Sequence, residues 1–216
     1  MIFVIGISGL TGAGKTTVAT RLHQYLSDPK NADVFDGVHI NKVLLIHQDK
    51  YFYARDSPHH KWIPEINFIN REVLSALDMD KFAADVCTTV QNLKVADEFN
   101  DISTISESIK EERKQINILI IEGFLIFNDE RINQHCQLRI HLYLSYNVGL
   151  ERRLKRNFKH INPKPEWYYE HYIWPMYHRY LNEVPNKNNL ICLNGELSFD
   201  EVFSQTYDSF AEFLRK

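Results

Sequence analysis

A glycine-rich loop near the start of the chain constrains its fold more than any other feature. Residues 9–16 read Gly-Leu-Thr-Gly-Ala-Gly-Lys-Thr and fit the pattern G-x-x-x-x-G-K-[ST] at every fixed position. The apolar run 2–5 precedes the loop, and the helix-like stretch 17–26 follows it. Such a loop forms a nest of N–H groups for anions, beside the positive end of the following helix. A chance match in a turn would lack this context, so we predict a nucleoside triphosphate site in an α/β fold.

Several residues of the loop are expected to bind the triphosphate, each in a different way. Lys15 would reach the β- and γ-phosphates and act in catalysis, and the Thr16 hydroxyl would hold Mg²⁺. The expected donor is ATP, with GTP as the open alternative. The predicted nucleotide-binding residues in and beside the loop are Gly9, Thr11, Gly12, Ala13, Gly14, Lys15, Thr16 and Thr17. The acceptor of the γ-phosphate must be bound by the rest of the chain.

The composition is that of one globular domain without a strong electrostatic bias. The 216 residues are 44% hydrophobic and carry a net charge of −3, which predicts a single domain over 1–216 with a full core. This balance gives no general attraction to nucleic acid or to membranes, and no apolar run approaches the length of a membrane span. We therefore expect a monomer with a small-molecule substrate and no nucleic-acid or membrane partner.

Cysteine usage and the first residues indicate the compartment. Cys87, Cys136 and Cys192 are widely spaced and lie in or near apolar stretches, so we expect buried, reduced thiols. The ten histidines show no zinc-binding spacing. Met1 leads directly into the first predicted strand, whereas a signal peptide needs a basic start and a longer apolar core. These features favour a cytoplasmic location, with nuclear presence left open.

Apolar runs alternate with helical patterns along the chain, as in a parallel α/β sheet. The predicted strands are 2–7, 43–46, 116–121, 138–144 and 190–193. The predicted helices are 16–26, one apolar face within 73–82, then 147–158, 167–181 and 202–214. Residues 54–66 are predicted as a loop, and 97–115 as a mobile polar excursion with some helix. The pattern predicts a P-loop NTPase fold, a five-stranded parallel sheet flanked by helices, with a helical lid at about 147–185.

Two carboxylates follow predicted strands, at the sheet edge where ligands gather. Glu122 ends a buried run, where it can face the loop and hold Mg²⁺ through a water; alternatively, it caps the next turn. Asp49 follows the second strand, where it could accept the proton of a hydroxyl in line with the γ-phosphate. Its neighbours Tyr51 and Phe52 would form an apolar wall for a planar substrate. In the alternative, Asp49 is a cap and these aromatic side chains fill the core.

A short basic cluster occupies the predicted helix 147–158. Arg152, Arg153 and Arg156 are three and four residues apart, which places them near one face. A solvated basic face is the default for such a run, and contact with nucleic acid is a second option. In a lid over a triphosphate, these arginines would neutralise the charge that develops during phosphoryl transfer. We favour the lid, with Arg152 and Arg156 on the nucleotide.

Several segments beyond the phosphate loop carry a resemblance to a known family. They include His-Gln-Asp-Lys-Tyr-Phe at 47–52, Val-Leu-Ser-Ala-Leu-Asp at 73–78, Ile-Glu-Gly-Phe-Leu-Ile-Phe-Asn at 121–128, Glu-Arg-Arg at 151–153 and Trp-Pro-Met-Tyr at 174–177. In order and spacing, the chain resembles the nicotinamide riboside kinase family, within the uridine kinase-like P-loop kinases. The segments at 121–128 and 174–177 are the most specific, because they separate this family from ordinary uridine kinases.

The resemblance implies a reaction and roles for individual residues. It implies Mg²⁺-dependent transfer from ATP or GTP to the 5′-hydroxyl of nicotinamide riboside, which yields nicotinamide mononucleotide for NAD synthesis. Asp49 matches the family's catalytic base. Lys15, Thr16 and Glu122 match its phosphate and metal residues. Arg153 matches a lid arginine that binds the ribose hydroxyls.

Departures from the family's pattern fall in the implied substrate pocket. Where the family often has an aromatic residue that stacks on the base and an aspartate that binds the ribose diol, this chain has Arg71 and Glu72. Glu72 can still accept two hydroxyl hydrogen bonds, whereas Arg71 could stack on a ring but would repel a cationic pyridinium. Phe158 matches the family's lid tyrosine without its hydroxyl. Trp62 or Phe68 could supply the missing aromatic.

Three other functions fit parts of the sequence. A uridine/cytidine kinase has the same architecture, and a neutral pyrimidine rich in carbonyl acceptors would tolerate Arg71 better. A GTP-dependent switch protein shares the phosphate loop but needs an Asn-Lys-x-Asp segment, and Asn-Lys-Val-Leu at 41–44 lacks the aspartate. A catalytically inactive binding module is disfavoured because the loop lysine and threonine and both strand-end carboxylates are present.

Overall fold

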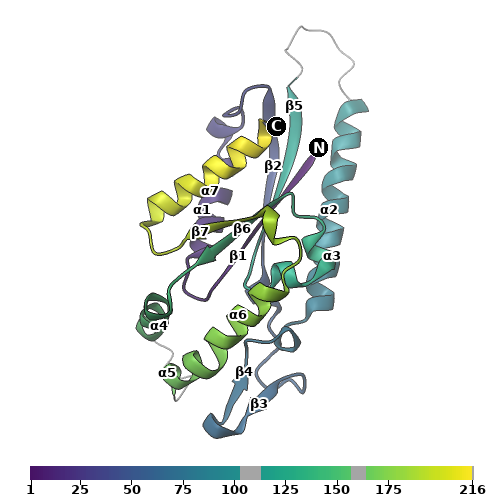
Figure 1. The fold of residues 1–216 in the computed structure, drawn as a ribbon. Helices are drawn as coiled ribbons and strands as arrows, with labels where there is room; N and C mark the ends of the chain where they lie inside the picture. The colour runs from purple at the N-terminus through teal and green to yellow at the C-terminus, as the bar shows by residue number, and fades with distance from the viewer. Residues whose placement is uncertain (103–112, 157–163, 216) are drawn as a thin grey trace.

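The computed structural model describes residues 1–102, 113–156 and 164–215. Its centre is a sheet of five parallel strands in the order β2-β5-β1-β6-β7 (Figure 1). These strands are β1 (Ile2–Gly9), β2 (Val38–His47), β5 (Lys114–Glu122), β6 (Leu138–Tyr143) and β7 (Leu190–Asn194). All five predicted strands are present, and the predicted P-loop NTPase fold is confirmed. Because β1 is the middle strand, the loop that follows it opens at the centre of the sheet edge.

Helices cover both faces of the sheet (Figure 1). They are α1 (Lys15–Ser27), α2 (Met79–Ile102), α3 (Glu130–Asn133) and α7 (Phe199–Leu214). Successive strand residues point to opposite faces, so Phe3 and Ile5 pack with α1 and α7, while Val4 packs with α2 and α3. The inner strand β5 is buried from Ile116 to Glu122, as expected for a parallel strand covered on both faces.

Between β6 and β7 the chain forms helices at one end of the sheet (Figure 1). They are α4 (Tyr146–Lys155), α5 (Pro165–Tyr168) and α6 (Trp174–Glu183), with a π-helical turn (Tyr169–Ile173) between α5 and α6. These helices match the predicted stretches 147–158 and 167–181, although residues 157–163 lie outside the described part of the chain. The predicted lid thus corresponds to a helical segment, and its motion as a lid stays a prediction.

The predicted loop 54–66 is wrong in part, because this region contributes to an antiparallel hairpin. Strands β3 (Lys61–Ile63) and β4 (Phe68–Asn70) pair with each other, and Asn67 in the turn has a left-handed backbone with φ of 45°. Phe68 is buried and packs edge-on against Tyr168, with ring centroids 5.4 Å apart. Trp62, in contrast, is 58% exposed. The hairpin therefore attaches to the helices between β6 and β7 through Phe68.

The predicted helical face within 73–82 is wrong for residues 73–78 and confirmed for 79–82. Residues Leu74–Ala76 form a single 3-10 turn, and α2 begins only at Met79. Asp78 ends the irregular segment because its Oδ1 accepts the N–H of Lys81 at 3.0 Å, as an N-cap does. The backbone just before Asp78 makes hydrogen bonds outside the helix, since the carbonyl oxygen of Ala76 accepts the N–H of Tyr53 at 3.1 Å. Tertiary hydrogen bonds have replaced the helix that the apolar spacing predicted.

The remaining predictions concern 97–115, the membrane and the cysteines. Helix α2 continues to Ile102 and β5 begins at Lys114, while 103–112 lie outside the described residues. None of the described helices is long and apolar enough to cross a membrane. The three cysteines are unpaired, but the prediction of burial is wrong for Cys192, which is exposed on the edge strand β7. The other two are half-buried.

Candidate active site

The phosphate loop leaves the carboxyl end of β1 and leads directly into α1. Gly12 and Gly14 have φ of 84° and 94°, values at which a side chain would be strained. The first helical hydrogen bond runs from the Val18 N–H to the carbonyl oxygen of Gly14 at 2.9 Å. The N–H groups of residues 15–17 are therefore left for a ligand at the start of the helix, as an anion site requires.

Lys15 lies half-buried in the loop, where its Nζ donates to the carbonyl oxygen of Leu10 at 3.0 Å. Desolvation lowers the pKa of this ammonium group, and the nearby carboxylates of Glu122 and Asp49 act in the opposite direction. The predicted phosphate-binding lysine, metal carboxylate and base thus lie within electrostatic reach of one another. They follow or end three neighbouring strands, β1, β5 and β2.

Glu122 is almost fully buried, with 2% of its surface exposed, and both of its carboxylate oxygens have partners. Thr16 Oγ1 donates to Oε2 at 3.2 Å, and Nδ1 of His47 lies 2.8 Å from Oε1. Because an ionised carboxylate only accepts, Nδ1 is the donor in this second bond. His47 was not among the predicted site residues, although it lies two residues before Asp49 at the end of a predicted strand.

The donor atoms at Thr16 and Glu122 fit Mg²⁺. A hydroxyl and a carboxylate are hard oxygen ligands, and Mg²⁺ commonly takes one or two carboxylates from a protein and fills its shell with water and phosphate oxygens. Within residues 1–102, 113–156 and 164–215, no group of three or more His, Cys, Asp or Glu side chains could hold a metal by itself. Thr16 and Glu122 would therefore hold Mg²⁺ together with the phosphates of a nucleotide.

Asp49 is exposed in a short 3-10 turn that directly follows β2. The residue before it, Gln48, is fully buried, and its Oε1 accepts the N–H of Leu125 at 3.0 Å. Gly123 lies against the same side chain, so closely that a Cβ atom there would overlap Gln48. The ends of β2 and β5 are thus locked together, which holds the backbone of Asp49 beside the phosphate loop.

The two aromatic residues after Asp49 have different surroundings. Tyr51 packs on α2, where its hydroxyl donates to Asp85 at 2.9 Å and its ring lies 4.8 Å from that of Phe82. Burial raises the pKa of Tyr51 to about 12. Its ring therefore supports the turn from the α2 side, and the expected wall consists of Phe52, which stacks on Phe124 with ring centroids 5.9 Å apart.

Arg71 and Glu72 lie beside this aromatic pair. The guanidinium carbon of Arg71 is 4.5 Å from the centre of the Phe52 ring, and the buried Nε has no hydrogen-bond partner among the described residues. Glu72 is half-buried, and desolvation raises the pKa of its carboxyl, although Arg153, Tyr168 and Arg71 lower it. The hydroxyl of Tyr168 donates to Oε1 of Glu72 at 3.2 Å.

The arginines of α4 reach the phosphate loop. Nη1 of Arg152 donates to the carbonyl oxygens of Gly12, at 3.2 Å, and Gly195, at 2.7 Å. Nη1 of Arg153 lies 3.5 Å from Oγ1 of Thr11. Arg156 is exposed, and its charge acts on Lys15. Arg152 thus supports the loop backbone, a role beyond the predicted contact with nucleotide, while Phe158 lies outside the described residues.

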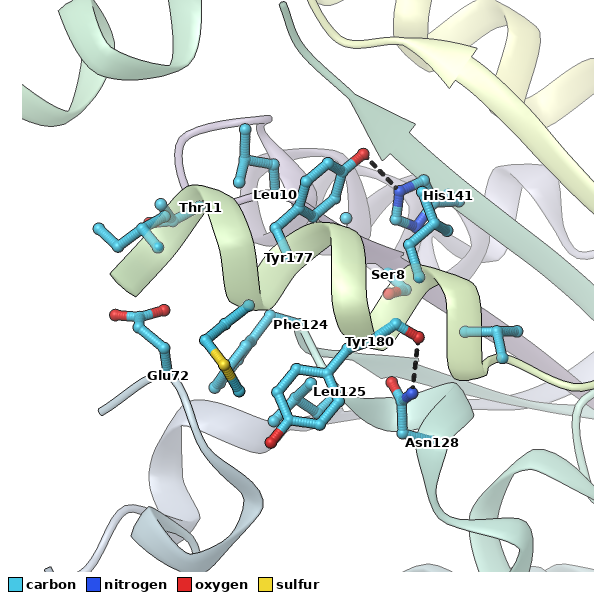
Figure 2. A pocket seen from close by; sticks show the side chains of 15 residues that line it. Ser8, Leu10, Thr11, Glu72, Phe124, Leu125, Asn128, His141, Tyr177 and Tyr180 are labelled. Carbon is cyan, nitrogen blue, oxygen red and sulfur yellow. Dashed lines mark hydrogen bonds between the residues drawn. The ribbon is translucent and has the colours of Figure 1, made fainter. Parts of the chain in front are cut away.

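A cavity that is partly open to solvent lies between the phosphate loop and α6. Figure 2 shows α6 crossing it, with Thr11 on one side of the helix and Phe124 and Leu125 on the other. Glu72 lines its end nearest Thr11 (Figure 2). The helix itself contributes Met176, Tyr177, Tyr180 and Leu181. Trp62 and Phe68, the suggested replacements for the missing aromatic, are not part of this lining.

His141 and Tyr177 are lining residues to which the sequence assigned no role in the site. His141 is 4% exposed in β6, and its Nε2 lies 3.0 Å from the hydroxyl of Tyr177 (Figure 2). Burial, with a smaller effect of Lys15, lowers the pKa of His141 to about 4. His141 could have been predicted as a site residue from its position near the end of the fourth predicted strand, because ligands gather at that edge of the sheet.

The parallel sheet and the glycine-rich loop after its middle strand define a P-loop NTPase. The fold is similar to that of YFH7 from Saccharomyces cerevisiae, a P-loop protein with a circular permutation, at a TM-score of 0.54, 14% identity and coverage of 89% of this chain and 92% of that chain. Residues 4–161 match the model of the Phosphoribulokinase / Uridine kinase family. The chain belongs to this family and is a kinase, a phosphotransferase.

Curated relatives cover almost the whole chain. Nicotinamide riboside kinase 1 of Homo sapiens is 30% identical over 216 residues, which are 99% of this chain and 94% of that protein. Nicotinamide riboside kinase 2 of Homo sapiens is 28% identical, with coverage of 96% and 80%. Uridine kinase of Leuconostoc citreum is 24% identical, with coverage of 89% and 87%. Within its family, the chain is thus similar to both kinds of nucleoside kinase.

Proposed function

We propose that the protein transfers the γ-phosphate of ATP, or of GTP, to the 5′-hydroxyl of nicotinamide riboside and so forms nicotinamide mononucleotide for NAD synthesis. The observation that carries this proposal is the position of Glu72, whose carboxyl borders the cavity and interacts with both Arg153 and Lys15. A carboxylate there can accept hydrogen bonds from the ribose diol. The near-full-length similarity to nicotinamide riboside kinases supports the same substrate.

The residues around Lys15 supply what phosphoryl transfer needs. Asp49 would accept the proton of the substrate's 5′-hydroxyl. The oxygen of that hydroxyl would attack the γ-phosphorus as the nucleoside diphosphate leaves. Lys15 would neutralise charge on the transferred group, since a preorganised cation acts most strongly where charge develops. Thr16 and Glu122 would hold Mg²⁺, which when bound would neutralise charge on the β- and γ-phosphates. Arg153 would orient the ribose against Glu72.

Phosphorylation of uridine or cytidine is the second candidate, and Arg71 is the observation that favours it. Nicotinamide riboside carries a cationic pyridinium ring, which the Arg71 guanidinium above Phe52 would repel. A pyrimidine is neutral and offers carbonyl acceptors to the unpartnered Nε. Against this candidate stand the aromatic faces of Phe52 and Phe124, because aromatic rings attract cations. We expect either enzyme to act as a cytoplasmic monomer on small molecules, with nuclear presence left open.

A panel of nucleosides tests the proposal. Nicotinamide riboside, uridine and cytidine are incubated separately with ATP or GTP and Mg²⁺, and release of the nucleoside diphosphate and the mass of the product are measured. We expect nicotinamide riboside to have the highest kcat/KM and to yield nicotinamide mononucleotide. A preference for uridine or cytidine of about tenfold, which corresponds to about 1.4 kcal/mol of transition-state stabilisation, would overturn it.

A further inference from the structure

His47 occupies a position beside the predicted metal carboxylate. It is the last residue of β2, and in the parallel register of β2 and β5 it lies directly next to Glu122, the last residue of β5. Nδ1 of His47 is 2.8 Å from Oε1 of Glu122, and the two side chains are 21% and 3% exposed. Thr16 Oγ1 binds the other oxygen. The carboxylate is therefore held from two sides, by the predicted metal ligand and by His47.

These two bonds keep Glu122 from a competing partner, Lys15. Opposite charges attract strongly where water is excluded, and Glu122 is the carboxylate with the largest effect on the pKa of Lys15. Lys15 nevertheless donates to the carbonyl oxygen of Leu10, and in the described structure no salt bridge joins it to Glu122. The lysine thus stays available for phosphates and the carboxylate for a metal.

The backbone of His47 is fixed by its neighbour. Gln48 is fully buried, accepts the Leu125 N–H at 3.0 Å, and leaves no room for a side chain at Gly123. The ring of His47 is therefore presented from a strand end that is locked to the strand carrying Glu122. An interaction built on two paired strand ends has little freedom, which is what orienting a metal ligand requires.

We propose that His47 is a positioning residue for the metal site. Its bond to Oε1 holds Glu122 so that Oε2 faces Thr16 and does not turn to Lys15. In this role His47 acts through Glu122. The inference rests on the proposed Mg²⁺-dependent transfer but not on which nucleoside is phosphorylated. Loss of a residue that orients a metal ligand changes metal affinity by about 10–100-fold.

The test is the effect of Mg²⁺ on ADP binding, measured by titration calorimetry on the full chain without nucleoside. The ratio of the Kd of ADP without Mg²⁺ to the Kd with saturating Mg²⁺ measures the coupling between metal and nucleotide. His47→Phe keeps a planar ring but has no donor, and we expect it to lower this ratio by about 10-fold or more while the Kd of ADP alone is unchanged. His47→Asn, whose amide nitrogen can replace Nδ1, should restore most of the ratio.

His39→Phe is the matched control, because His39 lies half-buried on the same strand and binds Asp33, away from the loop. It should leave the ratio at the wild-type value. The positioning role is excluded if His47→Phe keeps the wild-type ratio, if it weakens ADP equally with and without Mg²⁺, or if the wild-type protein shows no Mg²⁺ effect. Should His47→Phe lack a melting transition, the same criteria apply to His47→Leu, which also has no donor for Glu122. A wrong nucleoside assignment would instead appear in the substrate panel, with the coupling intact.

Discussion

The hydroxyl of Tyr168 donates a hydrogen bond to Oε1 of Glu72 across 3.2 Å. The same hydroxyl accepts the N–H of Arg71 at 3.1 Å, so one fully buried side chain of α5 holds both residues that depart from the family's pattern. Phe68 of the hairpin packs against the same ring. The carboxylate expected to bind the ribose is therefore oriented by the helices between β6 and β7.

Replacing Tyr168 with phenylalanine should weaken nucleoside binding more than it slows transfer. The bond from Tyr168 lowers the pKa of Glu72, so its loss raises that pKa and moves the acid limb of kcat/KM to higher pH. We also expect a loss of about 1–3 kcal/mol in the free energy of unfolding, because Oε1 of Glu72 loses its donor and the N–H of Arg71 loses its acceptor. Steady-state kinetics across pH and chemical denaturation measure both effects.

Tyr169→Phe is the control for this prediction. The Tyr169 hydroxyl is also buried but has no hydrogen-bond partner among the described residues. Its removal should leave the KM of the nucleoside and its pH profile unchanged. Equal effects of the two substitutions would contradict the role given to Tyr168.

Asp49→Asn should abolish transfer while nucleotide binding persists. The amide keeps the shape of the side chain but cannot accept the proton of the substrate hydroxyl, and loss of a general base commonly costs about 10²–10⁴-fold in rate. Single-turnover assays give the rate, and calorimetry gives the Kd of ATP. Asp56→Asn, in the exposed segment before the hairpin, is the control. Turnover near the wild-type rate would remove Asp49 as the base.

Lys15→Met should lower activity and raise the thermal stability of the ligand-free protein. Desolvation lowers the pKa of Lys15 below its value in the unfolded chain, so folding disfavours the charged lysine. The cost to the free energy of unfolding is fully present below the lowered pKa and is relieved only as the pH rises above it. At neutral pH, methionine removes this cost. We expect a Tm increase of about 2–4 °C, the shift that one kcal/mol produces in a domain of this size, measured by calorimetry. An unchanged or lower Tm would contradict it.

His141 should contribute to acid denaturation. Burial lowers the pKa of His141 from 6.5 to about 4, so the unfolded chain binds a proton between these values that the folded protein does not. Stability is therefore complete above pH 6.5 and falls toward pH 4, by about 3 kcal/mol from this group. His141→Gln should flatten the dependence over this interval in denaturation at several pH values. His178→Gln, at an exposed position of α6, should retain the wild-type slope.

The residues that could be predicted are those whose chemistry follows from local sequence. The phosphate loop is defined by consecutive residues, and the strand ends carrying Asp49 and Glu122 follow from apolar runs that must be buried on both faces. Helix α2 could not be placed in the same way. Apolar spacing predicted a start near Val73, but the backbone at Ala76 binds Tyr53 and moves the start to Met79.

The sequence by itself determined the fold class, the phosphate loop and the two strand-end carboxylates, because each depends on residue order within one element and its flanks. Only the tertiary structure decided which side chains share a partner. It turned Tyr51 toward α2, placed Arg71 over Phe52, and joined His47 to Glu122. Such pairings depend on strand order and on the packing of distant elements, and neither can be obtained from the spacing of residues along the chain.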